Sequence, residues 1–317
     1  MLPMELVSKL FAIVMGALSL SAGAIGTPAV ENYVTRAGVA SPAIQQEQEA
    51  ARAEVVPAED SSASYNWAGY VASGGDYTEV SGTWIVPYVE NLDGNGADAT
   101  WVGIGGVGRH DLIQAGTEAL PLEDGSVVYA AWYELLPDDS HMVPFKVAPG
   151  DSVTVTVKEE TTNHWVIDFE NNTTGDSYKK RVAYESSYAS AEWIEEMPLS
   201  PDVPLTLNHF GVVEFTDGHA VQDGELVSIE ESGAKPLRME NGGGETLAIV
   251  SEIGKDGESF SVARTDADSD PLQHVMRERF RAEPRVTEVA GETSEEAVRT
   301  IVFDDGWSIV VVRFFAD

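Results

Sequence analysis

The stretch Ser152-Val153-Thr154-Val155-Thr156-Val157 alternates apolar and hydroxyl-bearing side chains with a period of two residues. Successive side chains of a β-strand point to opposite faces, so the three valines share one face and the hydroxyls share the other. This pattern is typical of a strand that is buried on one face and polar on the other. It predicts a sheet that packs against a core.

Similar short apolar runs continue on both sides of this stretch, from Tyr65 to about Thr265. Gly, Asn, Asp and Pro turns separate the runs, and no convincing amphipathic helix interrupts them. Many short strands with frequent turns predict an all-β fold, an antiparallel β-sandwich of the jelly-roll or concanavalin-like type. The clearest further runs are 80–86, 165–169, 182–184 and 212–215.

The first residues have the features of a secretory signal. Lys9 precedes the apolar run Leu10 to Leu20, and Ala22-Gly23-Ala24 matches an A-x-A cleavage pattern. The run is short for a bilayer span, which needs ~20 residues, although a membrane anchor is the alternative. Residues 1–24 are therefore predicted to be a signal peptide. We expect a secreted, extracellular protein that has no contact with the membrane after signal removal.

Three more segments follow the signal. Residues 25–62 are predicted to be a pro-segment or linker, with a short helix over Gln45–Arg52. Residues 63–265 form the predicted sandwich domain. Residues 266–317 are predicted to be a small α+β C-terminal appendage of unknown role. Its helix would carry Leu272, Val275, Met276 and Phe280 at helical spacing, and a hairpin would follow from Ile301 to Phe315.

The composition limits the function. Fifty-three acidic residues against nineteen basic ones give a net charge of −34, which repels phosphate backbones and argues against nucleic-acid binding. Such acidity suits either work at low pH or a salt-rich habitat. Composition does not choose between these two. Cysteine is absent, so disulfides and thiol chemistry are excluded.

Several familiar site patterns lack their context. Gly103 to Gly108 match G-x-G-x-x-G, but a strand-like run follows where a dinucleotide site needs a helix. The histidines show no metal-binding spacing, so no metal or other cofactor is expected. Neither a G-x-S-x-G elbow nor the Asp-Thr-Gly and Asp-Ser-Gly tripeptides of pepsin-like peptidases occur.

Seven aromatic-rich segments remain. They are Asn66-Trp67-Ala68-Gly69-Tyr70, Val80 to Pro87, Trp101 to Gly106, Leu112-Ile113-Gln114-Ala115-Gly116, Ala131-Trp132-Tyr133-Glu134, Ala191-Glu192-Trp193-Ile194-Glu195 and Val213 to Asp217. In their order and spacing they resemble the glutamic peptidases of family G1, the eqolisins. The resemblance covers about residues 65–265, nearly the whole predicted sandwich.

The resemblance implies two curved antiparallel sheets with a cleft over one of them. The catalytic glutamine of the family matches Gln114 and its catalytic glutamate matches Glu192. Substrate-cleft positions of the family match Trp67, Trp101 and Glu134. The implied activity is an acid endopeptidase that is insensitive to pepstatin and acts on unfolded or extended polypeptides. We expect a monomer.

The two residue types suit peptide hydrolysis. A glutamate whose pKa is near the ordinary ~4.3 is partly ionised in mild acid, so Glu192 would serve first as base and then as acid. The uncharged amide of Gln114 would donate to the developing oxyanion, and losing one such donor costs roughly 3–4 kcal/mol of barrier. Trp67 and Trp101 would form apolar walls that exclude water.

The chain departs from the family at several points. Two positions that are often acidic in the family are Gly105 and Ala130 here, so the pH optimum is open. The 25–62 segment has only Arg36 and Arg52 as basic residues, which argues against self-inhibition by docking on an acidic domain. Two alternatives therefore stay open. One is a glycan-active jelly-roll hydrolase that uses Glu134 and Glu192 as its two carboxylates. The other is a non-catalytic peptide-binding relative.

Overall fold

The computed structural model describes residues 33–90, 96–107, 111–122, 124–198 and 205–269, and the backbone of two strands at 297–302 and 308–314. The predicted signal peptide and the predicted helix over 272–280 lie outside the described residues. The hairpin predicted near the C-terminus is confirmed in its strands. They are the antiparallel pair β19 (Ala297–Val302) and β20 (Ser308–Phe314).

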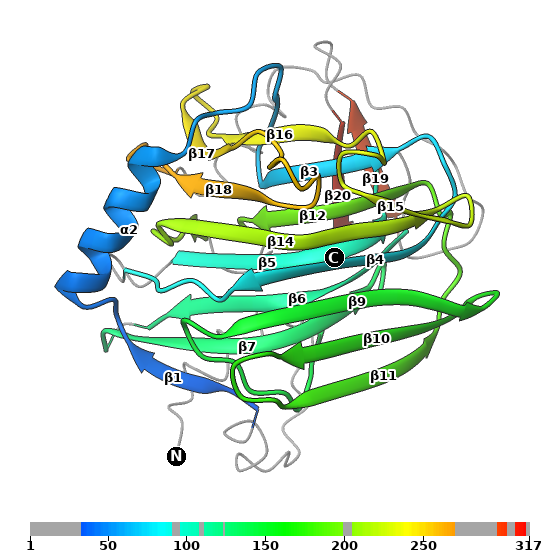
Figure 1. Cartoon of the computed structure of the whole chain (residues 1–317), viewed down its shortest axis with the longest axis horizontal. Coiled ribbons are helices and arrows are strands. Elements are labelled where there is room, and N and C mark those ends of the chain that lie inside the picture. The colour runs from blue at the N-terminus through cyan, green and yellow to red at the C-terminus, as the bar shows by residue number, and fades with distance from the viewer. Residues whose placement is uncertain are drawn as a thin grey trace.

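One hydrogen-bonded sheet folds over on itself into two layers (Figure 1). The strands of the first layer, in spatial order, are β1 (Thr35–Gly38), β7 (Ser126–Leu135), β6 (Leu112–Pro121), β5 (Gly96–Gly105), β12 (Ser190–Glu196), β3 (Trp67–Ser73), β16 (Lys235–Glu240) and β2 (Ser62–Ser64). Those of the second are β11 (Ser177–Ala183), β10 (His164–Asn171), β9 (Ser152–Thr161), β4 (Tyr77–Ile85), β14 (Val212–Gln222) and β18 (Phe260–Arg264).

Strand β17 (Thr246–Val250) pairs with both β16 and β18 and so joins the two layers. The short strands β8 (His141–Met142), β13 (Thr206–Leu207) and β15 (Glu225–Ser228) pair with parts of β7, β5 and β14, respectively. All described pairings are antiparallel except β16 with β2 and β5 with β13. The predicted antiparallel β-sandwich is confirmed.

The core lies between the layers. Val153, Val155 and Val157 of β9 are fully buried there, as the alternating pattern predicted. Two tryptophans each donate a hydrogen bond across the core to a residue of the opposite layer. Trp84 of β4 donates from Nε1 to Thr117 Oγ1 at 2.9 Å, and Trp193 of β12 donates from Nε1 to the Ser81 carbonyl at 2.8 Å. These bonds satisfy both buried indole N–H groups and fix the register of one layer on the other.

The N-terminal segment packs along the sandwich. Its strand β1 pairs with β7 and forms one edge of the first layer, and β2 pairs with β16. Between them, α2 (Pro42–Glu54) contains and extends the predicted helix over Gln45–Arg52, and Ser41 caps its N-terminus. Gln48 donates to the carbonyls of Tyr88 and Phe210 at 2.8 and 3.0 Å. No helix among the described residues is long and apolar enough to span a bilayer.

Candidate active site

Four adjacent strands bring Glu192, Gly103, Gln114 and Glu134 into one row. Glu192 of β12 lies opposite Gly103 of β5, Gly103 lies opposite Gln114 of β6, and Gln114 lies opposite Glu134 of β7. Residues that are directly opposite in a sheet project from the same face. The side chains of Glu192 and Gln114 therefore share a face, which is the one turned away from the core.

Gly103 lies between these two residues, and a side chain at its position would crowd its neighbours. A Cβ at this position would lie 3.2 Å from the Cβ of Gln114 and 3.0 Å from Cζ3 of Trp101. These contacts are tighter than ordinary van der Waals packing, so any larger residue would push against Gln114. Because Gly103 has no side chain, nothing from β5 stands between the carboxyl of Glu192 and the amide of Gln114.

The amide of Gln114 is held from one side. Its Nε2 donates to Oε2 of Glu134 at 2.6 Å, and the glutamine is only 5% exposed. Its Oε1 is buried with no hydrogen-bond partner among the described residues. Glu134, predicted as a substrate-cleft position, thus lies next to Gln114 and orients it. One N–H of Gln114 and its carbonyl oxygen stay available to a ligand.

Glu192 is fully buried, and neither of its carboxyl oxygens has a hydrogen-bond partner in the described part of the chain. Burial raises its pKa well above the usual value, and the negative charge of Asp111 raises the pKa further. The nearby Ser190 hydroxyl lowers the pKa, although it makes no hydrogen bond of ordinary geometry to the carboxyl. The expectation of an ordinary pKa near ~4.3 is therefore wrong. Desolvation thus favours the neutral form of this carboxyl over the ionised form.

Trp67 and Trp101 lie beside the row and pack edge to face, with ring centroids 5.1 Å apart. Glu196 holds them in place. Its carboxyl accepts from Trp101 Nε1 at 2.7 Å and from Asn66 Nδ2 at 2.9 Å. Burial raises the pKa of Glu196 to about 7, although these hydrogen bonds lower it. Sequence reasoning missed this residue, but its signal was present, because a residue four positions after Glu192 on a strand shares its face.

The same face carries two more buried polar atoms without described partners, Trp132 Nε1 and Glu118 Oε1. Burial raises the pKa of Glu118 to about 8, and the negative charges of Asp98 and Glu134 add to this. The apolar residues around them are Val71, Ala99, Trp101, Leu112, Leu136 and Ile194. Unsatisfied polar groups are rare in apolar surroundings, and their concentration here marks a site for water or a polar ligand.

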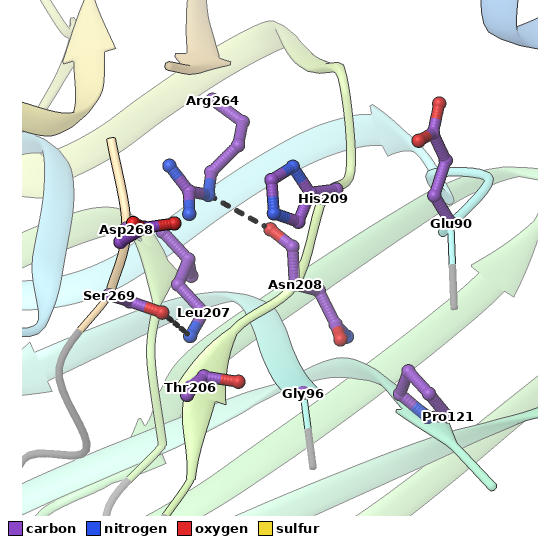
Figure 2. A pocket seen from close by; sticks show the side chains of 10 residues that line it. All are labelled: Glu90, Gly96, Pro121, Thr206, Leu207, Asn208, His209, Arg264, Asp268 and Ser269. Carbon is purple, nitrogen blue, oxygen red and sulfur yellow. Dashed lines mark hydrogen bonds between the residues drawn. The ribbon is translucent and has the colours of Figure 1, made fainter. Parts of the chain in front are cut away.

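The cavity in Figure 2 lies elsewhere in the fold. It has a volume of about 320 Å³ and contains neither Gln114 nor Glu192. Its rim includes Gly96, the first residue of β5, which is roughly 23 Å from Gly103 at ~3.3 Å per residue. Arg264 fills part of its wall and donates from Nε to the Asn208 carbonyl at 3.2 Å. The described residues include no group of three or more His, Asp or Glu side chains arranged to hold a metal ion.

Comparison with known proteins identifies the family of the chain. The model of the Peptidase A4 family matches residues 65–263. Aspergillopepsin-2 of Aspergillus niger is 31% identical over 224 residues, which are 63% of this chain and 77% of that protein. Scytalidopepsin B of Scytalidium lignicola is 30% identical over 200 residues, 59% of this chain and 75% of that protein.

A solved structure extends the likeness to the fold. Scytalido-glutamic peptidase, crystallised with a peptide based transition state analog, superposes with a TM-score of 0.53 at 27% identity, covering 63% of this chain and 98% of that one. The family match over residues 65–263 contains every residue of the row. The chain belongs to the Peptidase A4 family and is, like these relatives, a glutamic peptidase.

Proposed function

We propose that the chain is a secreted acid endopeptidase whose catalytic residues are Glu192 and Gln114. The observation that carries the proposal is their position in one row of paired residues, on one face, with only Gly103 between them. A carboxyl and a carboxamide with unsatisfied atoms on one face are suited to hold one water against a peptide carbonyl.

The reaction follows from the two groups. In its ionised form, Glu192 takes a proton from water while the water oxygen bonds to the carbonyl carbon of the substrate. The free N–H of Gln114 donates to the oxyanion that forms. Protonated Glu192 then gives its proton to the amide nitrogen as the C–N bond breaks, which restores the carboxylate. Glu134 takes no proton in this scheme, because its contribution is to orient Gln114.

The substrate class is an extended or unfolded polypeptide. The indoles of Trp67 and Trp101 and the neighbouring Ile194 offer a broad apolar surface beside the pair. Scytalido-glutamic peptidase binds a peptide based transition state analog, and this supports a peptide substrate for the present chain too. Secretion is supported by the sequence of residues 1–24 alone.

A glycan hydrolase built on Glu134 and Glu192 is less well supported. These residues are three strands apart, roughly 14 Å at the backbone, whereas paired catalytic carboxyls of glycosidases lie about 5–9.5 Å apart. Gln114 also stands between them and engages Glu134. A test for reducing-sugar release from β-glucan or xylan is a simple check on this alternative.

Digestion of a denatured protein at pH 3–5 tests the proposal. We expect cleavage by the wild type in the presence of pepstatin, and a loss of at least ~100-fold in kcat for Glu192→Gln and for Gln114→Ala. Glu170→Gln changes an exposed glutamate on β10 and should cleave normally. Undiminished cleavage by either active-site variant contradicts the assignment. Peptide binding without turnover by the wild type would identify a non-catalytic relative.

A further inference from the structure

Asp111 occupies the space beside the C-terminal end of β5. Gly105, the last residue of β5, lies opposite Leu112 and has a φ of +97°, a left-handed conformation that favours glycine. A Cβ at Gly105 would lie 2.6 Å from the Asp111 carbonyl oxygen and 3.0 Å from its carboxyl Oδ2. The carboxyl of Asp111 thus sits against the strand that separates Glu192 from Gln114.

Asp111 is anchored by the connection that leads into β12. Its Oδ2 accepts from the backbone N–H of Ser187 at 2.6 Å and from Ser186 Oγ at 3.3 Å. Next to it, the Leu112 N–H donates to the hydroxyl of Tyr184 at 2.7 Å. The start of β6, which carries Gln114, is therefore tied to the segment that enters β12, which carries Glu192.

Asp111 also acts electrostatically on Glu192. Burial already disfavours the ionised form of Glu192, and the negative charge of Asp111 disfavours it further. The other titratable groups nearby are Tyr77 on β4, Glu134 beyond Gln114, and Glu195 and Glu196 on β12 itself. Tyr77 is neutral in acid and Glu195 lies on the opposite, core-facing side of β12.

We propose that Asp111 is a positioning residue for Glu192, which ties the entry to β12 to the start of β6 and places a negative charge close to the Glu192 carboxyl. The catalytic consequence of this interaction rests on the proposed function, in which Glu192 is the acid–base group. The physical content of the proposal is an interaction between the carboxyl of Asp111, which directly precedes β6, and the carboxyl of Glu192 on β12, and it can be measured without turnover.

The first experiment titrates Glu192 by carbon-13 NMR of labelled glutamate side chains, with Glu192→Gln to assign the signal. Asp111→Asn keeps an acceptor oxygen for the Ser187 N–H but removes the charge. We expect the pKa of Glu192 to fall by about 0.5–1 units in this variant. Asp176→Asn, at the exposed turn between β10 and β11, changes the net charge equally and should leave the titration unaltered. An unchanged Glu192 titration in Asp111→Asn overturns the proposal.

The second experiment is a pH profile of kcat/KM. If Glu192 is the base, the acid limb of the profile moves to lower pH in Asp111→Asn by the same amount as the titration. A purely structural role would lower activity at every pH without moving the limb, and that result contradicts the proposal. An NMR shift without any Glu192-dependent cleavage by the wild type would support the carboxyl interaction and refute the proposed function instead.

Discussion

Gln114 donates a 2.6 Å hydrogen bond to Glu134, its direct cross-strand neighbour on β7. The bond fixes which end of the amide faces Glu134 and which atoms remain for the substrate. Burial raises the pKa of Glu134 to about 8, although the bond from Gln114 lowers it, so the acceptor is a neutral acid over the acidic range. The carboxyl can accept from Gln114 without adding a charge next to Glu192.

Glu134→Ala should therefore slow catalysis by releasing Gln114. We expect a fall in kcat of about 10–100-fold, by analogy with metal ligands that lose the partners that orient them, with a smaller change in KM. Glu134→Gln keeps an acceptor oxygen and should retain most of the activity. Steady-state kinetics at pH 4 on a fluorogenic peptide distinguishes these outcomes. Equal losses in both variants would mean that the acidic group itself is needed.

Gly103→Ala should damage the site through crowding. The new methyl group would lie 3.2 Å from the Cβ of Gln114 and 3.0 Å from the Trp101 ring. We expect a loss of stability of about 1–3 kcal/mol and a larger loss of kcat than of substrate binding. Gly38→Ala on β1 meets nothing within 4 Å and is the matched control. Thermal unfolding and kinetics check both, and a fully active Gly103→Ala would contradict the need for an open space.

The fold should lose stability as the pH rises from ~4 to ~8. Burial raises the pKa of Asp98 and Glu196 to about 7 and that of Glu118 and Glu134 to about 8. Both folded and unfolded chains bind these protons below ~4, so stability is complete there. As the pH rises, the unfolded carboxyls ionise first, and stability falls until the folded pKa values are passed.

Melting temperatures between pH 4 and pH 8 measure this effect, and we expect a drop of roughly 10 °C or more. Glu118→Gln is uncharged at every pH and should flatten the dependence. Glu170→Gln, at an exposed site, should leave the curve as in the wild type. A melting temperature that rises towards pH 8 would contradict the sign of these shifts.

Gln48→Ala should loosen the N-terminal segment. The variant removes both hydrogen bonds that join α2 to the carbonyls of Tyr88 and Phe210, and leaves those half-buried acceptors without this donor. We expect a loss of about 1–2 kcal/mol in the free energy of unfolding. Gln46→Ala, on the exposed face of the same helix, should have little effect. Chemical denaturation compares the two, and equal stabilities would mean that α2 does not brace the sandwich.

Local patterns in the sequence were enough to predict the fold. The period-two alternation of 152–157 and its neighbours predicted half-buried strands, and their burial against the core follows from that alternation alone. The order of the aromatic-rich segments pointed to the family and to Gln114 and Glu192. The alternation involves residues that are near one another along the chain, and the order of the segments is read directly from it, so the sequence by itself determines the fold class and the family.

Only the tertiary structure decided how the site is tuned. The pKa of Glu192 depends on complete burial and on Asp111, and the orientation of Gln114 depends on Glu134. These partners come from different strands, and their distances are set by sheet register rather than by sequence separation. Desolvation and charge proximity are properties of three-dimensional packing, and for that reason the sequence suggested an ordinary carboxyl where the fold makes a strongly perturbed one.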